Sequence, residues 1–467
     1  MSAVAVKKRS VDLTKGGIFK NLLRFSLPLI ATSILQLMFN AADMVVVGLS
    51  SKGEDAIGAI GCTNALVNLI LNLFIGMSGG AGIVLARAYG AKNKEYAERA
   101  LHTAMVVSVI AGIAVTILGT TMSGVMLEWM NTPMESIGMA KTYLLIYFSG
   151  SIFNLVYNFG ASMLRAMGDT VRPLKFLILG GILNVIANLI AVKGFDMNVD
   201  GVAIATILSQ AVSAVLVVIT LFKKDAYYVT LDRKKFGINA RALKETLRLG
   251  IPGGLNGMMF SLSNILIQSS INSFGREVVN GCAASSTIEG FYFVIFQGFQ
   301  LGALNIISQN YGAGNFERIK KCLFVSAGTI LAVCIVVSSI MMALKEPLFS
   351  LLTDTEASAL AGYERFAVIT PTYVLCALMG MMNEGIRGMN VSVPPTIITM
   401  IGTCVFRVLW VFFVVPLNHQ VATIYTGMVI SWVITGIALL VLLLSVYKKK
   451  KLQFAQYVPV EQQAEQL

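Results

Sequence analysis

The sequence predicts an all-α polytopic membrane protein with twelve transmembrane helices, arranged as two pseudo-symmetric six-helix lobes around a central cavity. Three observations predict this fold class: the composition, a series of apolar segments and an internal repeat. Of the 467 residues, 56% are hydrophobic and only 13% are charged, which is too apolar for a soluble chain of this length. Helices are expected because open sheet edges cannot be satisfied in lipid.

Twelve apolar segments are long enough to cross a bilayer, for which about 20 apolar residues suffice. Several exceed that length, which implies tilted helices or polar ends. The expected spans are 20–49, 56–86, 99–124, 137–163, 173–194, 201–223, 244–271, 281–308, 318–344, 361–386, 394–416 and 422–447.

The basic residues predict the orientation of the chain in the membrane. With the N-terminus inside, 29 of the 36 lysines and arginines fall on the cytoplasmic side. Six fall outside, Arg365 among them, and Arg407 lies within a span. Because cytoplasmic loops carry the excess of positive charge, we expect a multi-pass protein of the prokaryotic plasma membrane with both termini cytoplasmic. The net charge of +12 is thus a topology signal, and no nucleic acid partner is expected.

The internal repeat divides the chain into two parallel halves. Arg24 and Pro28 recur as Arg248 and Pro252, and LRAMGDTVRP at 164–173 recurs as IRGMNVSVPP at 386–395. Such repeats are typical of transporters in which two lobes alternate in exposing a central site. The predicted organisation is a cytoplasmic tail (1–17), an N-terminal lobe (18–223), a linker (224–243), a C-terminal lobe (244–447) and a second tail (448–467).

The segment Phe25–Gly48 holds one carboxylate, Asp43, in an otherwise apolar span. Gln36 and Asn40 lie seven and three residues before it, so the three side chains share one helical face. An ionisable residue within a span costs about 2.5–3.5 kcal/mol to insert and usually marks a functional site. We predict that Asp43 binds the coupling cation of a transporter; the alternative is a structural, hydrogen-bonded aspartate.

Asparagines four residues apart form polar stripes on other helices of the first lobe. With the helix of Asp43 they are predicted to surround the cation, because a carboxylate with amide oxygens suits Na⁺ and a buried carboxylate also suits H⁺. The alternative is that they join helices through hydrogen bonds. The predicted cation ligands besides Asp43, Asn40 and Gln36 are Asn68, Asn72, Asn154, Asn158, Asn184 and Asn188; Asn64 belongs to the same stripe as Asn68.

The second lobe has Ile267 where the repeat places Asp43, and its own carboxylate is Glu289. We predict that Glu289 binds substrate, with a structural salt bridge as the alternative, and Arg407 as its partner or as a structural residue. Methionine and aromatic side chains suit a promiscuous apolar or cationic substrate. The predicted substrate-binding residues are Glu289, Met38, Tyr157, Met259, Phe260, Asn264, Tyr292 and Gln297.

No enzymatic site is expected. The sequence has no Ser/His/Asp set and only two histidines, and its six cysteines form no CxxC pair. The glycines Gly79, Gly80 and Gly82 match no phosphate-binding pattern and predict close helix packing instead. We therefore expect no cofactor and no metal other than Na⁺ at Asp43.

Taken together, the motifs resemble those of the multidrug and toxic compound extrusion (MATE) transporters of bacteria, over roughly 20–447. The resemblance rests on LPLI…NxxD…VG (27–48), GA (90–91), LRAMGD…P (164–173), ILN (182–184), GIP (250–252), ISQNYGAGN (307–315) and FRVLW (406–410).

The resemblance implies antiport of organic, cationic or amphipathic compounds against inward Na⁺ or H⁺, by a monomer. It places Asp43 at the family's N-lobe cation site and Glu289 at an acid common in helix 8. Asn188 stands where some members have a second acid, and Phe260 stands near the helix 7 glutamate of another subgroup. A lipid-linked saccharide flippase of the same superfamily is the alternative, and the single intramembrane basic residue, Arg407, disfavours it.

Overall fold

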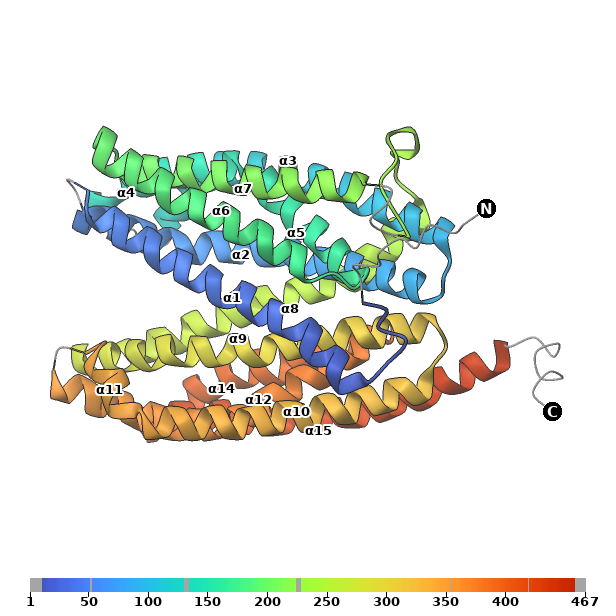
Figure 1. Ribbon diagram of the computed structural model, residues 1–467. Coiled ribbons are helices and arrows are strands. Elements are labelled where there is room, and N and C mark those ends of the chain that lie inside the picture. Colours follow the sequence, from blue (N-terminus) through green and yellow to red (C-terminus); the bar gives the residue numbers. More distant parts are fainter. Residues whose placement is uncertain are drawn as a thin grey trace. The chain divides into compact units, whose positions relative to one another are not determined.

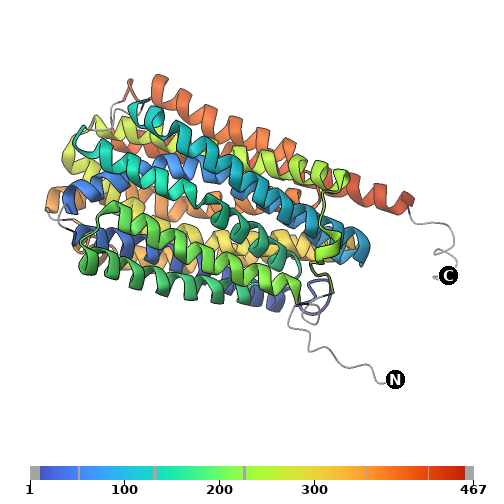
Figure 2. The same cartoon turned by 90° about the horizontal axis from the view of Figure 1, so that it is seen from above.

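The computed structural model describes residues 11–50, 53–129, 134–223, 228–353, 355–418 and 420–457. These residues fold as helices joined by short turns, with no strand among them (Figure 1). Within each of two compact units the long helices run side by side (Figures 1 and 2). The predicted all-helical, two-lobed fold class is confirmed.

The first unit contains Ala31–Met258 together with Val11 and Asp12. The second contains Leu13–Ile30 and the chain from Met259 onward. Two helices are therefore shared: α1 (Ile18–Gly48), which contains Pro28, and α8 (Ala240–Asn272), which contains Pro252. In each, the change of unit falls a few residues after the proline.

The remaining helices belong to one unit each. The first unit has α2 (Gly53–Gly90), α3 (Lys94–Trp129), α4 (Met134–Ser149), α5 (Ser151–Ala166), α6 (Val171–Leu189), the π-helical η1 (Ile190–Gly194), α7 (Val199–Phe222) and the short η2 (Arg233–Lys235). The second has α9 (Arg276–Gly312), α10 (Phe316–Ala343), α11 (Lys345–Ser350), α12 (Glu356–Gly388), α13 (Val393–Thr399), the π-helical η3 (Met400–Val405), α14 (Phe406–Phe413) and α15 (Val421–Tyr457).

Each of the twelve predicted spans corresponds to a helical stretch in the described residues. Within the part of the chain that the structure describes, ten helices are long and apolar enough to cross a membrane, and α4 with α5, bent by 49°, form an eleventh if they are taken as one span. The twelfth stretch, α8, has 33 residues and so a length of about 50 Å, but it does not pass the same test of hydropathy. The break at Gly150, the short α11 and the continuation of α15 through the 448–451 lysines to Tyr457 were not predicted.

The repeat is visible in the backbone as well as in the sequence. Lys92 (φ 53°) and Gly314 (φ 72°) both adopt the left-handed conformation, 222 residues apart. Gly168 (φ 89°) and Asn390 (φ 67°) do the same at the same separation. A left-handed residue ends a helix and redirects the chain, so the corresponding turns of the two halves have the same geometry even where the residue types differ.

Helices of the first unit approach closely at glycines. Gly76 lies against the backbone of Gly254, and Gly80 lies against the backbone of Gly250, so neither position has room for a Cβ. Gly82 likewise abuts the Ser162 hydroxyl. The prediction that these glycines serve helix packing is confirmed for Gly80 and Gly82, and it follows that α2 and the first part of α8 contact each other through their main chains.

The described part of the linker between the two halves packs against α3 of the first unit. His102 of α3 accepts a hydrogen bond from the Asp232 amide at its Nε2 (2.9 Å), while its Nδ1 lies 2.7 Å from the Glu98 carbonyl of the same helix. The Asn239 amide donates to Thr103 (2.9 Å), and Lys235 pairs with Glu98 (3.0 Å). Residues 232–239 are thereby held on α3.

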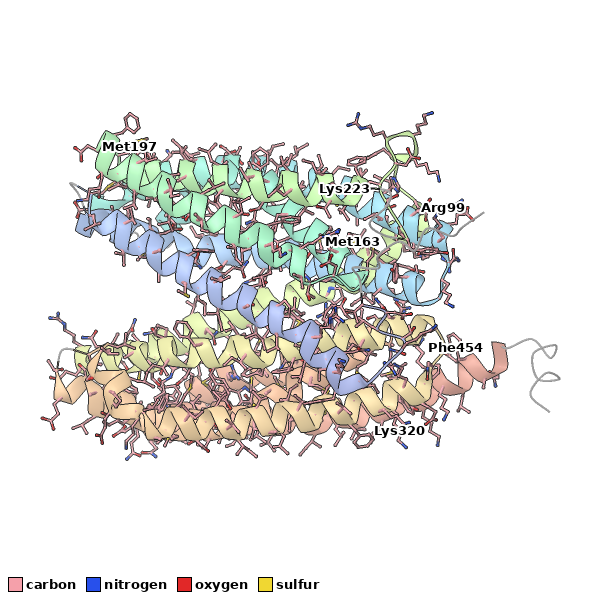
Figure 3. All side chains as sticks on the ribbon, viewed as in Figure 1. Arg99, Met163, Met197, Lys223, Lys320 and Phe454 are labelled. Carbon is pink, nitrogen blue, oxygen red and sulfur yellow. The ribbon has the colours of Figure 1, made fainter. Side chains whose placement is uncertain are left out.

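Figure 3 shows which labelled residues share an end of the helices within each unit. In the first unit, Arg99 and Lys223 lie at one end of the helices and Met197 lies at the other (Figure 3). In the second unit, Lys320 and Phe454 lie at one shared end of its helices (Figure 3).

Candidate functional site

In the first unit, Asp43 is joined to α6. Asn188 donates a hydrogen bond from Nδ2 to the Asp43 carboxylate, with 2.6 Å between Nδ2 and Oδ1. The same Nδ2 lies 3.4 Å from Oδ1 of Asn184, one turn earlier, and Asn184 donates to Thr206 of α7 (3.3 Å). Asp43 is half-buried, whereas Asn184 and Asn188 are buried. The four-residue spacing thus places a carboxylate and two amides in one polar chain.

One oxygen of this chain has no partner within the described residues. Oδ1 of Asn188 is buried and accepts no hydrogen bond there, although buried carbonyl oxygens are normally satisfied. Tyr143 and Tyr147 of α4, whose rings stack 5.8 Å apart, lie near the Asp43 carboxylate. The carboxylate oxygens of Asp43 and the unsatisfied amide oxygen of Asn188 are the kind of ligands that a hard cation prefers.

The other predicted ligands of the first unit do not hydrogen-bond to Asp43 in the described part of the chain. Gln36, Asn40 and Asn68 are exposed. Asn72 lies against Gly257 of α8. Asn158 donates to Oδ1 of Asn154 (2.9 Å) within α5. The side chains of Asn64 and Cys62 lie outside the described residues.

In the second unit, Glu289 of α9 is engaged in a buried ion pair with Arg365 of α12. The guanidinium approaches both carboxylate oxygens, Nε at 3.0 Å and Nη2 at 2.7 Å. Ser285 donates to the same carboxylate (2.7 Å), and the hydroxyl of Tyr373 lies 3.4 Å away. Glu289 is 2% exposed. A bidentate pair of this kind is geometrically specific and leaves the carboxylate neutralised.

Arg365 was not recognised from the sequence. Counted with the outer loops from the sequence, it lies within α12, and its side chain faces the interior of the second unit. Of the two alternatives for Arg407, that of partner to Glu289 is wrong, because Arg365 pairs with the Glu289 carboxylate. The sequence did contain a signal for a buried arginine. Arg365 lies inside the predicted span 361–386, and Tyr373 follows about two helical turns later, on a similar face of the helix. Arg365 also stacks over Tyr425, 5.0 Å from the ring centroid.

Arg407 of α14 is 3% exposed and has no carboxylate beside it in the described chain. Its Nε donates to Ser431 (3.0 Å). Its guanidinium carbon lies 5.6 Å from the ring centroid of Phe260 and 5.7 Å from that of Trp432. Its Nη2 is buried and has no hydrogen-bond partner among the described residues.

The predicted substrate-binding residues are found in two environments. Tyr292 is fully buried and bonds to the Cys334 carbonyl and to Ser338. Tyr157 is also buried, in the core of the first unit, and its hydroxyl donates to the Pro173 carbonyl (3.2 Å). The partly or largely exposed members are Met38, Met259, Phe260, Asn264 and Gln297.

Comparisons with known proteins agree with this architecture. The profile of the MatE family matches residues 28–190 and again 252–413, so its two copies begin at Pro28 and Pro252, 224 residues apart. The probable multidrug resistance protein YpnP of Bacillus subtilis (strain 168) is 28% identical over 67% of this chain and 69% of its own length. The probable multidrug resistance protein NorM of Thermotoga maritima is 27% identical over 82% of both chains.

The fold is shared with solved structures. The outward-facing conformation of a multidrug resistance MATE family transporter superposes with a TM-score of 0.87, at 21% identity, over 95% of this chain and 99% of that one. The twofold profile match covers well over half of the sequence, and the relatives that match are multidrug resistance proteins. The class of protein is therefore a membrane transporter rather than an enzyme. The chain belongs to the MatE family.

Proposed function

We propose that the protein is a secondary active efflux antiporter that exports organic, amphipathic compounds in exchange for inward H⁺ or Na⁺ by alternating access. The relatives described as multidrug resistance proteins and the parallel repeat support this class of activity. We place the protein in the prokaryotic plasma membrane as a monomer with cytoplasmic termini.

The observation that carries the proposal is the pairing of Asp43 with Asn188. Nδ2 of Asn188 donates to Oδ1 of Asp43 over 2.6 Å, and Oδ1 of the same amide is buried without a partner in the described residues. A cation bound by both oxygens satisfies the buried amide oxygen and balances the carboxylate. A proton on Asp43 balances the carboxylate but leaves the amide oxygen of Asn188 unsatisfied. Transport coupled to Na⁺ should therefore depend on Asn188 more strongly than transport coupled to H⁺.

The ion pair of Glu289 supports a different substrate chemistry in the second unit from the cationic one expected from the sequence. Since Arg365 neutralises Glu289, this carboxylate is not free to attract a cationic compound. We therefore propose that substrate recognition there is mainly apolar and aromatic. Within the second unit, the partly exposed Met259 and Phe260 are the members of the predicted set that suit such a surface.

The test is dye efflux from vesicles containing the purified protein, under an imposed Na⁺ gradient or an imposed pH gradient. We expect Asp43→Asn to abolish gradient-driven efflux, with unchanged expression and helix content. Asp55→Asn, which alters an exposed carboxylate of α2, is the matched control and should retain efflux. Undiminished efflux by Asp43→Asn would refute the proposal.

The gradient arms identify the ion. Efflux driven by Na⁺ alone, and lost in Asn188→Leu, assigns a sodium site to the Asp43–Asn188 pair. Efflux driven by pH alone, and kept at a reduced level by Asn188→Leu, assigns a proton to Asp43. Absence of efflux under both gradients in the wild-type protein would contradict antiport and favour a flippase.

A further inference from the structure

The interior of the second unit has an excess of positive charge. Its buried carboxylate, Glu289, is paired with Arg365 (2.7 Å), and the half-buried Glu384 is paired with Arg387 (2.6 Å). Arg407 has no such partner in the described chain. Among the described residues, the titratable groups near it are Cys376, Cys404 and Tyr373, none of which is a carboxylic acid.

Two side chains of α15, of which Trp432 contacts this guanidinium, also have unsatisfied hydrogen-bond groups. Nη2 of Arg407, Nε1 of Trp432 and the hydroxyl of Thr435 are all buried without a partner in the described residues. Arg407 packs over the Trp432 ring, and Trp432 and Thr435 lie three residues apart on α15, next to Ser431, which receives the Arg407 Nε. Thr435 also abuts Gly402 of η3, the π-helical turn that leads into α14.

These groups have the chemistry of an anion site. A guanidinium N–H and an indole N–H are donors only, and a buried donor without an acceptor is unfavourable. A buried charge without a partner is more unfavourable still. One anion accepting from Arg407 and Trp432 removes both problems. A π-helical turn within a helix often marks a functional position.

We propose that Arg407 and Trp432 form a binding site for a monovalent anionic group, either a halide ion or the carboxylate of a substrate. One positive charge with neutral donors around it balances a single negative charge, and so disfavours a divalent anion. The site lies wholly within the second unit. It goes beyond the proposed export activity and does not depend on the cation site at Asp43.

The test measures thermal unfolding of the purified protein in detergent while sodium chloride or sodium acetate replaces sodium sulfate at constant ionic strength. A ligand that binds only the folded protein raises the unfolding temperature with concentration. We expect a saturable rise for the wild-type protein. Trp432→Phe keeps the ring but removes the N–H, and should weaken the apparent affinity at least tenfold; Arg407→Met should abolish the response.

Trp410→Phe is the matched control, because Nε1 of Trp410 already donates to the Thr423 carbonyl (2.8 Å), and it should respond as the wild type does. If Arg407→Met does not fold, Trp432→Phe against Trp410→Phe decides the question. A rise in unfolding temperature with chloride but not with acetate identifies a halide site. A rise with acetate identifies a site that accepts a carboxylate. An equal response of all variants, or none in the wild-type protein, would overturn the proposal.

Discussion

The buried pair of Glu289 and Arg365 allows a quantitative prediction of stability. Glu289→Gln keeps the size of the side chain but leaves the guanidinium of Arg365 without its counter-charge, in a site where Glu289 is 2% exposed. Removing one partner of a buried ion pair costs about 3–5 kcal/mol. For a unit of this size, 1 kcal/mol shifts the unfolding temperature by about 2–4 °C. The expected loss is therefore about 6–20 °C.

The reasoning requires that the double change behaves differently. Glu289→Met combined with Arg365→Met removes both charges, and apolar replacement of a buried pair is often neutral or stabilising. We expect the double variant to unfold within about 4 °C of the wild type. Glu364→Gln, which alters an exposed carboxylate next to Arg365 in sequence, is the control and should change little.

The assay is thermal unfolding in detergent, followed by circular dichroism and by the loss of monodisperse protein. Two results would refute the reasoning. One is a shift below about 3 °C for Glu289→Gln, which would mean that Arg365 is readily solvated. The other is a double variant as unstable as the single one, which would mean that Ser285 and Tyr373, rather than the charge, determine the stability.

Three further predictions concern the first unit. Asn188→Leu should weaken cation-driven dye efflux more than Thr206→Val does, because Asn188 bonds to Asp43 whereas Thr206 bonds to Asn184. Gly76→Ala should destabilise the protein by about 1–3 kcal/mol through overpacking, measured by thermal unfolding, because a Cβ there meets the backbone of Gly254. His102→Ala should speed tryptic cleavage of the segment 233–235, because the Asp232 amide loses its acceptor.

Each of these has an internal comparison. If Thr206→Val loses as much coupled efflux as Asn188→Leu, the loss arises from the hydrogen bond between Asn184 and Thr206 rather than from the contact with Asp43. Gly61→Ala, in the same helix but with open space around it, should be neutral or stabilising, and equal losses at both glycines would contradict the packing argument. Unchanged cleavage in His102→Ala would mean that Thr103 and Glu98 suffice to hold the segment.

The amount that sequence could predict depended on whether residues share a helix. Asn184 and Asn188 could be assigned to one face because helical periodicity fixes it, and the repeat identified the two halves. The partner of Glu289 could not be found in this way. Arg365 is 76 residues distant, and which residues meet between two helices depends on how each is rotated about its axis. The same applies to Arg407 and Trp432.

The polarity of α8 also shows a limit of reading spans one at a time. An apolar window marks a helix that faces lipid, whereas α8 contains Gly250, Gly254 and several hydroxyl and amide side chains. Its glycines receive the main chain of α2, so part of its surface is covered by protein. A helix covered in this way needs less hydrophobicity than one exposed to lipid.

That same polarity has a consequence for how the chain is made. Emerging from the ribosome after the linker, α8 is a weak substrate for lateral release into lipid, because insertion depends on the summed hydrophobicity of a segment. Its glycine face fits α2, which is synthesised much earlier. We therefore expect α8 to insert by packing against the first half, which is synthesised before it. Correct insertion of the second half then depends on correct assembly of the first.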